Sequence, residues 1–359
     1  MSLSHADDYP IHQTPEPIAF AGTDRNFYDR YFFNGYWPDG SGFFALALGV
    51  YPHLDIADAH FTFIRKGRQH CLHTSCELGM ERMAMRVGPI SIEVTEPLQR
   101  LKATIESTDG IAGEFEFTGR SFPIAEPRFI HRIGPRAFMD YTRMTQNGLY
   151  TGWIDCDGER VEIAEGTVGT RDRSWGVRPI GARDTQPMPG HPIPQFFWQW
   201  TPLNLENGSL FFHINADADG NAWNTRAAFA PDGGDAASIV EGEGRLTGSL
   251  IEGSRWPAGA TLSDLNLPGA PAQLELEPLA RFQMKGLGYT HPEWGHGLHH
   301  GPLKVEREDF DLDALDPEAL ENRHVQMICA VHSGGQRLGT GAFEQLILGP
   351  YAPLDLVSF

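Results

Sequence analysis

Two short stretches of the sequence carry most of the side chains that could do chemistry. The first, GTRDRSWGVRP at 169–179, surrounds Asp172 with arginines and includes Trp175. The second, GYTHPEWGHGLHHG at 288–301, places four histidines, Glu293 and Trp294 within fourteen residues. Each stretch combines a carboxylate, a tryptophan and a cation or titratable ring, which are the parts of an acid–base site.

Asp172 could act as a general acid only if burial raised its pKa towards neutrality. Its neighbours Arg171 and Arg173 argue against this, because a nearby cation stabilises the ionised carboxylate. The first stretch therefore resembles an ion-pair clamp that pins a loop more than it resembles an acid, and the acid role stays open.

The second stretch offers a clearer proton donor. A carboxyl that packs against an indole loses water and its pKa rises, so Glu293 beside Trp294 could donate a proton at neutral pH. His291 and His296 titrate near neutrality and could orient that donor, although histidines in loops more often hold neighbouring segments in place. The side chains expected to bind substrate are mostly aromatic: Trp175, Trp294, Tyr289, Trp198, Trp200 and Arg173.

A metal site is another interpretation of the histidines. His291 and His296 are five residues apart and His296 and His299 are three apart, in a segment that glycines and a proline interrupt. No helix would hold them in register as in the common zinc motifs. A second cluster, HCLHTSC at 70–76, has ligand-type residues without a CxxC pair. We expect no metal and no cofactor, and a metal-dependent enzyme stays as a third hypothesis.

The elements that must position these side chains are strands. Alternating apolar and polar residues predict strands with one buried face at GEFEFTG (113–119), QLELE (273–277) and RFQMK (281–285). A strand at FFWQW (196–200) would place Phe196, Trp198 and Trp200 on one face, as core or barrel lining. Apolar runs bounded by turn residues predict more strands, such as FFALALGV (43–50), SLFFHIN (209–215), VQMICAVH (325–332) and EQLILG (344–349). Helical spacing is scarce, and only 311–324 could hold short helical turns. The pattern indicates an all-β protein, either a barrel or a sandwich.

The two halves of the chain echo each other weakly. DGSGFFALALGV at 39–50 resembles NGSLFFHINADA at 207–218, and DGERVEIAEGTVG at 157–169 resembles GGQRLGTGAFEQLILG at 334–349. Chance similarity between hairpins and a duplicated β-domain both remain possible explanations. The Pro- and Gly-rich segment 178–194 is the best linker candidate, so we predict domains at residues 1–185 and 186–359.

Composition excludes several classes of function. The net charge is −19 and no basic cluster is present, which disfavours nucleic acid and anionic membranes as partners. The N-terminus lacks a signal-peptide pattern, and the longest apolar run, 43–51, is too short to span a bilayer. With four cysteines as well, a cytoplasmic protein is expected. The sequence contains no GxGxxG motif after a strand, no P-loop and no GxSxG elbow, which disfavours nucleotide and esterase chemistry.

Three stretches resemble the carotenoid 1,2-hydratase and AttH-like group: RDRSWGVRP (171–179), GYTHPEWGHG (288–297) and GTGAFEQLILGP (339–350). The resemblance implies two lipocalin-like antiparallel β-barrels packed side by side. It also implies cofactor-free hydration of a carotenoid double bond, or cyclisation of a polyene held between the barrels. Relatives commonly have histidine where this chain has Arg173, which weakens an acid–base role at that position.

We therefore expect a cofactor-independent enzyme that protonates an isoprenoid, steroid-like or polyene substrate and thereby hydrates, isomerises or cyclises it. Glu293 or Asp172 would give the proton, with His291 and His296 orienting the donor. The alternative is a non-catalytic carrier of a hydrophobic small molecule, because lipocalin-like barrels often only bind. The sequence leaves open the substrate, the oligomeric state, and whether the two stretches share one cleft.

Overall fold

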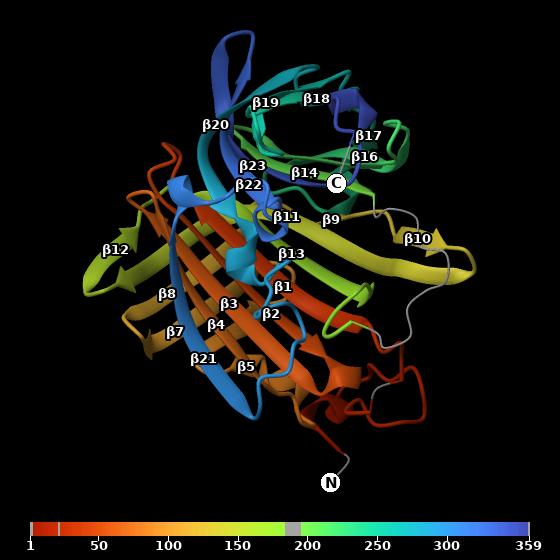
Figure 1. The fold of residues 1–359 in the computed structure, drawn as a ribbon, viewed down its shortest axis with the longest axis vertical. Helices are drawn as coiled ribbons and strands as arrows, with labels where there is room; N and C mark the ends of the chain where they lie inside the picture. Colours follow the sequence, from red (N-terminus) through yellow and green to blue (C-terminus); the bar gives the residue numbers. More distant parts are fainter. Residues whose placement is uncertain (1–2, 21, 184–194, 358–359) are drawn as a thin grey trace.

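The computed structural model describes residues 3–20, 22–183 and 195–357, and in these ranges every regular element longer than four residues is a β-strand. Fourteen strands form the first sheet (Figure 1): β1 (Phe27–Tyr36), β2 (Phe43–Tyr51), β3 (Ile56–Arg65), β4 (Arg68–Glu77), β5 (Arg86–Val87), β6 (Ile90–Glu96), β7 (Arg100–Thr108), β8 (Ile111–Gly119), β9 (Ile124–Ala125), β10 (Phe129–Ile133), β11 (Arg136–Cys156), β12 (Glu159–Ile163), β13 (Val168–Val177) and β21 (Leu303–Asp311).

Nine strands of the second half form the other sheet: β14 (Phe196–Leu205), β15 (Gly208–Ala216), β16 (Ala222–Pro231), β17 (Val240–Gly242), β18 (Arg245–Leu250), β19 (Pro257–Ser263), β20 (Leu274–Gln283), β22 (Val325–Ser333) and β23 (Gln336–Leu348). All strand pairs are antiparallel, and both sheets curl (Figure 1). The predicted fold class, two lipocalin-like antiparallel β-barrels side by side, is confirmed.

The helices of the described ranges are short 3₁₀ turns: η1 (His5–Asp8), η2 (Pro52–Leu54), η3 (Arg82–Ala84), η4 (Ala236–Ser238), η5 (Met284–Leu287), η6 (Leu312–Ala314), η7 (Leu320–Asn322) and η8 (Ala352–Leu354). Two of them, η6 and η7, lie where short helical turns were expected. Within the described residues, no helix has the length and apolar character needed to cross a membrane. All four cysteines are free thiols.

The two sheets repeat one strand order. The first runs β4-β3-β2-β1-β13-β11-β8-β7-β6, and the second runs β17-β16-β15-β14-β23-β22-β20-β19-β18. In both sheets the first strand of the half therefore pairs with its last long strand, β1 with β13 and β14 with β23. This is the order that a duplicated β-domain would produce.

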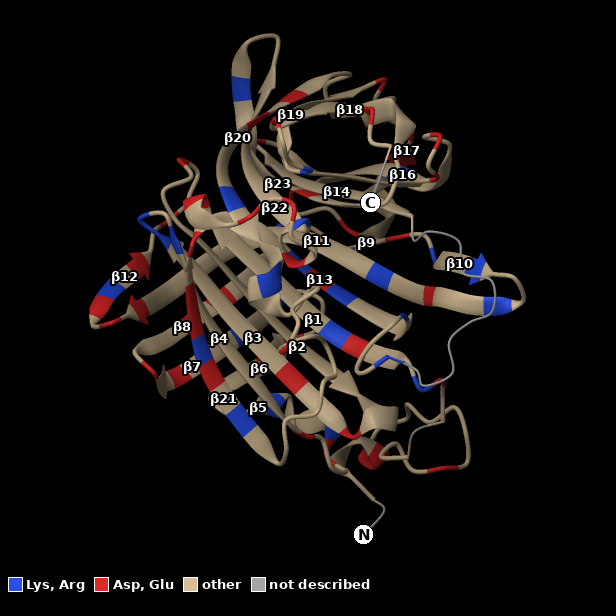
Figure 2. Ribbon diagram, in the orientation of Figure 1, with Lys and Arg blue, Asp and Glu red and all other residues tan. Residues whose placement is uncertain are grey.

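One strand crosses between the halves. β21 comes from the second half of the chain but pairs with β4 at the edge of the first sheet. Figure 2 shows basic and acidic residues mixed along β21, which fits an exposed edge strand. The predicted boundary at residues 185/186 and most of the predicted linker lie outside the described residues.

The strand predictions differ from the structure mainly around 273–285. We expected two strands there, but β20 is one strand whose register shifts between Pro278 and Ala280. Proline has no N–H for the ladder, so a bulge at Pro278 lets the strand continue. Met284 and Lys285 were expected in the strand but begin η5, which leads into the second polar stretch.

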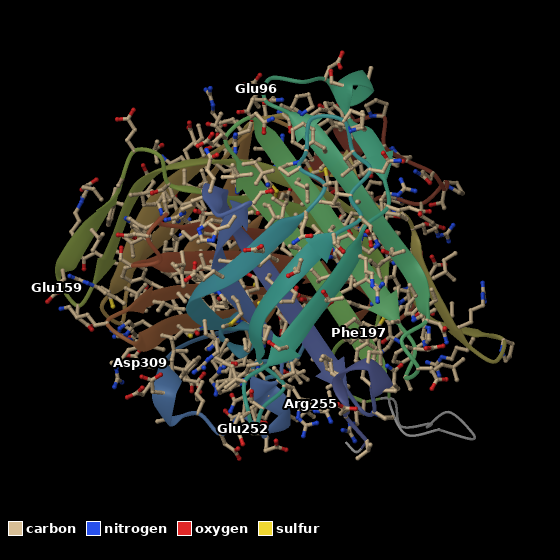
Figure 3. The ribbon with its side chains drawn as sticks, turned by 90° about the horizontal axis from the view of Figure 1, so that it is seen from above. Glu96, Glu159, Phe197, Glu252, Arg255 and Asp309 are labelled. Atoms are coloured by element: carbon tan, nitrogen blue, oxygen red, sulfur yellow. The ribbon has the colours of Figure 1, made fainter. Side chains whose placement is uncertain are left out.

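The largest apolar cluster lies where the sheets face each other. Phe32 of β1 meets Trp200 of β14 edge to face, with ring centroids 6.1 Å apart, and both side chains are buried. Asn147 Nδ2 donates to the Leu203 carbonyl at 2.8 Å, so polar contacts also join the halves. Figure 3, which looks from above, shows the green to blue strands of the second sheet crossing in front of the red-brown strands of the first.

Gly169 marks a close approach of two backbones. A Cβ at this position would overlap the carbonyl oxygen of Asn34 on β1, and a Cβ at Gly339 would overlap that of Asn204 on β14 in the same way. We expect Gly169→Ala to lower the free energy of unfolding by about 1–3 kcal/mol, because backbone cannot yield as a side chain does. Urea denaturation would measure this. Gly22→Ala is the control, since its added Cβ meets nothing within 4 Å; equal stability of the two variants would contradict the close approach.

Candidate functional site

A cavity of about 140 Å³ lies between the two sheets and opens to solvent. Strands β1, β11 and β13 form one wall, and β14, β23 and the turn after η5 form the other. Its lining is aromatic with a small set of charged groups: Tyr28, Phe32, Met139, Tyr141, Arg143, Asp172, Ser174, Arg178, Phe196, Trp198, Tyr289, Thr290, His324, Glu344 and Leu346. Such apolar cavities with a few convergent polar groups are typical of small-molecule sites.

Asp172 is the cavity's unusual carboxyl. It lies on β13, its side chain is 12% exposed, and its Oδ2 is 4.0 Å from Nε of Arg143. Burial raises the pKa of Asp172 to about 7; Arg143 opposes the rise, while Glu126 and Glu344 add to it. The carboxyl is therefore poised to hold a proton at neutral pH and to release it.

The arginines that flank Asp172 in sequence do not hold it. Arg171 Nε donates to Oε1 of Gln146 at 2.7 Å, and Arg173 pairs with Asp29. Neighbouring residues on a strand point to opposite faces, so both arginines lie away from the cavity. The clamp expected from the flanking arginines is therefore not found, and the ion pair of Asp172 is with Arg143 of β11 instead.

Arg143 of β11 is the cation that Asp172 does face. Its guanidinium lies over the rings of Trp198 and Trp200, at 4.6 and 5.9 Å from their centroids, and 3.8 Å from Oε2 of Glu126. Trp200 in turn donates its indole N–H to Glu126 at 3.2 Å. The two predicted tryptophans of β14 thus position a buried ion pair.

The pKa of Glu344, on β23, is shifted in the opposite direction to that of Asp172. The Glu344 carboxylate accepts hydrogen bonds from His324 Nε2 at 2.7 Å, Gln326 Nε2 at 2.6 Å and Trp198 Nε1 at 3.1 Å. Burial alone would raise the pKa of Glu344, but His324, Gln326 and the nearby Arg143 outweigh it and lower the pKa. One cavity therefore holds a carboxyl that keeps its proton and a carboxylate that loses it, the arrangement of an acid–base pair.

The sequence did not single out Arg143, Glu126, His324 or Glu344. Arg143, Glu126 and His324 lie in ordinary strands or turns with no local motif, and Glu344 stands in GTGAFEQLILGP (339–350), where it was not considered as a site residue. The one signal was a charged residue at an inward position of an alternating strand, as Glu344 is in FEQLIL at 343–348.

The two polar stretches meet, but not through Glu293. Tyr289 lines the cavity that contains Asp172. His296 is buried, accepts from Arg178 at 2.9 Å through Nδ1, and its Nε2 lies against the Leu287 carbonyl at 2.8 Å. Burial, Arg30 and Arg178 hold the pKa of His296 well below its ordinary value, so this ring is a neutral link that positions Arg178.

Glu293 is exposed, and Trp294 turns away from it to stack on His73 with ring centroids 5.4 Å apart. The expected desolvation of Glu293 by Trp294 is therefore not found. Trp294 lies outside the cavity, as does His291, whose Nε2 is 3.2 Å from Glu308 Oε2. Trp175 and Arg173 line a different cavity, on the other face of β13.

In the part of the chain that the structure describes, two groups of side chains have donor atoms within 4.8 Å of one another, close enough to consider for a metal: His70, Cys156 and Asp157, and His73, His291 and Glu308. In the first group, Arg307 donates to both oxygens of Asp157 at 2.6 and 2.8 Å, so a guanidinium already provides the positive charge.

In the second group, His291 Nδ1 accepts the backbone N–H groups of Glu293 at 3.1 Å and Trp294 at 2.8 Å. The ring proton then belongs on Nε2, the atom that would have to bind the metal. Hydrogen bonding within this group therefore suits a hydrogen bond from neutral His291 to the Glu308 carboxylate better than a metal.

Comparison with known proteins identifies the family of this chain but assigns no activity to it. The model of a family of unknown function, DUF8625, matches residues 3–357. The chain belongs to this family. No curated protein matches the chain.

Solved structures support the fold. A candidate AttH protein from Nitrosomonas europaea is 16% identical, with a TM-score of 0.54 over 94% of this chain and 98% of that chain. CghA is 10% identical, with a TM-score of 0.50 over 90% and 89% of the two chains. Kievitone hydratase from Nectria haematococca is 11% identical, with a TM-score of 0.45 over 92% of each chain. At these identities, the similarity of this chain to AttH and CghA concerns the fold alone.

Proposed function

We propose that this protein is an enzyme that protonates a carbon–carbon double bond of an apolar substrate in the cavity between the sheets. The outcome would be hydration, isomerisation or cyclisation, and an isoprenoid, steroid-like or polyene substrate would suit the aromatic lining. The observation that carries the proposal is the pairing of Asp172, with its pKa raised to about 7, and Glu344, with its pKa lowered, in one aromatic cavity.

The residues suit the steps of such a reaction. Asp172 gives its proton to the alkene, and the carboxylate that remains is stabilised by Arg143 at 4.0 Å. The carbocation lies against aromatic faces, which attract cations. Glu344, hydrogen-bonded to His324, takes a proton either from an attacking water or from the carbon next to the cation. The proton given by Asp172 is thereby balanced by the proton taken at Glu344.

The size of the cavity limits what can enter. An apolar cavity of about 150 Å³ admits benzene, so about 140 Å³ has room for one ring or the end of a chain. We therefore propose that the substrate inserts its reacting end and leaves the remainder towards the opening. CghA, which has a similar fold, has been solved with Sch210972, which supports a ligand-binding role for this fold.

Native mass spectrometry of the protein purified from its host, followed by solvent extraction, would identify a bound ligand. That ligand, with squalene and geranylgeraniol as isoprenoid alkenes, is then incubated with the enzyme in D₂O. Deuterium at carbon in the wild type supports alkene protonation. Bound ligand without any deuterium incorporation would instead identify a carrier and overturn the proposal.

The variant Glu293→Gln tests Glu293, the proton donor that the sequence favoured. Because Glu293 is exposed and outside the cavity, we expect the variant to keep its rate of deuterium incorporation to within about twofold, as surface substitutions usually do. A loss of a hundredfold or more would return Glu293 to the site and contradict the role given to Asp172.

A further inference from the structure

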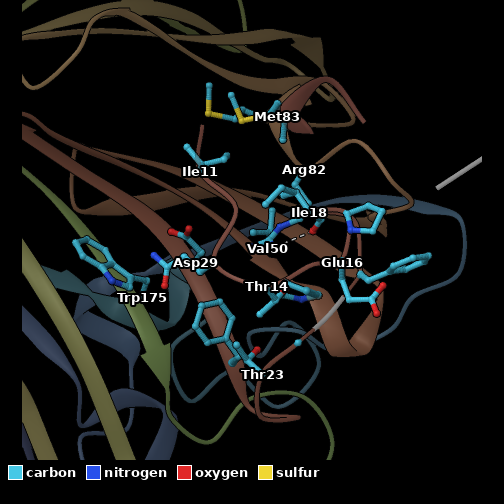
Figure 4. Close-up of a pocket in the computed structure, with 18 of the residues that line it drawn as sticks. Ile11, Thr14, Glu16, Ile18, Thr23, Asp29, Val50, Arg82, Met83 and Trp175 are labelled. Atoms are coloured by element: carbon cyan, nitrogen blue, oxygen red, sulfur yellow. Dashed lines mark hydrogen bonds between the residues drawn. The ribbon is translucent and has the colours of Figure 1, made fainter. Parts of the chain in front are cut away.

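A second and larger cavity lies beneath the N-terminal segment. Its volume is about 630 Å³, within the range of roughly 300–1,000 Å³ that small-molecule sites occupy. Residues of 6–20, with Gly22 and Thr23, form one side, and β1, β2, β13 and the turn at η3 form the other (Figure 4). The cavity thus lies between the irregular N-terminal segment and the first sheet and is open to solvent.

Most of its lining is apolar. Leu48 and Val50 come from β2, and Ile11, Ile18 and Phe20 from the N-terminal segment. Several of these large side chains keep unusual exposure, including Ile11 at 48%, Phe20 at 44%, Met83 at 46% and Trp175 at 39%. An apolar ligand would remove this surface from water, which is favourable in proportion to the area covered.

Arg82 places a positive charge in the apolar lining of this cavity. Its guanidinium makes one weak contact, from Nη1 to the Ile18 carbonyl at 3.5 Å, and across residues 3–20, 22–183 and 195–357 it has no ion pair (Figure 4). The other charges of the lining are satisfied: Asp29 pairs with Arg173, and Glu16 is exposed to water. Burial lowers the pKa of Arg82 and the Asp29 carboxylate opposes that shift, so the cation is short of solvent and has a counter-charge only beyond ion-pair distance.

We propose that this cavity binds an apolar carboxylate such as a fatty acid, with the carboxylate on Arg82 and the chain along the apolar lining. An arginine fork matches a carboxylate through two parallel hydrogen bonds, which a neutral head group cannot reproduce. Such a ligand accounts for both unusual features of the cavity: its carboxylate would pair with the Arg82 cation, and its chain would cover the exposed apolar side chains.

This site is separate from the cavity of Asp172. Arg173 and Trp175 line the fatty-acid cavity, whereas Asp172 and Ser174 line the other. The four residues alternate along β13, so the strand presents one face to each cavity. The proposal therefore does not rest on the proposed reaction.

Calorimetric titration of the full chain with decanoate and with 1-decanol tests it. We expect decanoate to bind at least about tenfold more tightly, because a hydrogen bond to a charged group contributes roughly 1.5–3 kcal/mol. Arg82→Gln should remove that difference by weakening decanoate alone, and Arg82→Lys should restore part of it. Arg86→Gln is the matched control, since Arg86 pairs with Glu106 and does not line the cavity.

A second variant locates the site. An added Cβ at Gly22 meets nothing within 4 Å, and Gly22 lines this cavity, so Gly22→Phe should fill it and weaken both ligands. Asp172→Asn should change neither affinity. No binding of decanoate, equal binding of the two ligands, or decanoate binding that Arg82→Gln leaves intact would each overturn the proposal. Loss of decanoate binding in Asp172→Asn would also overturn the proposal, because the ligand would then bind in the cavity of Asp172.

Discussion

Replacing Asp172 by asparagine should leave the protein folded and lower the rate of alkene protonation by about 10²–10⁴-fold, the usual contribution of a general acid. Asparagine keeps the size and polarity of the side chain but has no proton to give. In the wild type the rate should fall as the pH rises through about 7, because only protonated Asp172 can act and its pKa is raised to about 7.

Deuterium incorporation into the substrate, followed from pH 5 to pH 9, measures both effects. Asp140→Asn is the matched control: Asp140 is an aspartate of the neighbouring strand β11, paired with the exposed Arg128 at 2.7 Å and outside the cavity. A rate for Asp172→Asn equal to that of Asp140→Asn, or a wild-type rate that increases through neutral pH, would contradict the assignment.

The same carboxyl predicts a pH dependence of stability that needs no substrate. The pKa of Asp172 is raised from 3.8 to about 7 on folding, so protonated Asp172 favours the folded state. That contribution is complete below pH 3.8 and is lost as the pH rises to about 7. Asparagine does not titrate, so the stability of Asp172→Asn relative to the wild type should increase over this interval. Urea denaturation at pH 5 and pH 7.5 would show it.

The strands could be predicted from the sequence because their pattern is local. Alternation identified β8 and β14, and apolar runs bounded by turn residues identified β2, β15 and β22. The pairing of β21 with β4 could not be predicted, since an edge strand of mixed charge carries no mark of its partner. The bulge at Pro278 was also missed, because proline in a pattern normally indicates a break.

The candidate site was predictable only in part, and for a physical reason. Asp172, Trp198 and Tyr289 stood in recognisable stretches and do line the cavity. Glu293 was favoured because Trp294 is its neighbour in sequence, yet in the structure the two side chains diverge. The pKa of Asp172 is raised instead by its burial between the sheets, with Arg143 opposing the rise from β11 and Glu344 adding to it from the other sheet.

Arg143 should be a strongly stabilising charge of the interior. Burial by itself would lower its pKa, but Glu126, Asp172 and the nearby tyrosines outweigh burial and hold the pKa above its usual range. Its side chain is only 13% exposed and stacks on Trp198. Removing this cation would leave Glu126 buried without a counter-charge, which typically costs about 3–5 kcal/mol.

We therefore expect Arg143→Met to lower the free energy of unfolding by about 3–5 kcal/mol in urea denaturation, and the double variant Arg143→Met, Glu126→Gln to recover part of the loss. Arg128→Met is the matched control, because its pair with Asp140 is exposed and should contribute at most about 1 kcal/mol. If the double variant were no more stable than Arg143→Met, the loss would come from packing against the tryptophans and not from an uncompensated charge. Recovery would show that Glu126 depends on Arg143 for its counter-charge, and Glu126 is one of the two carboxylates that add to the burial-driven rise in the pKa of Asp172.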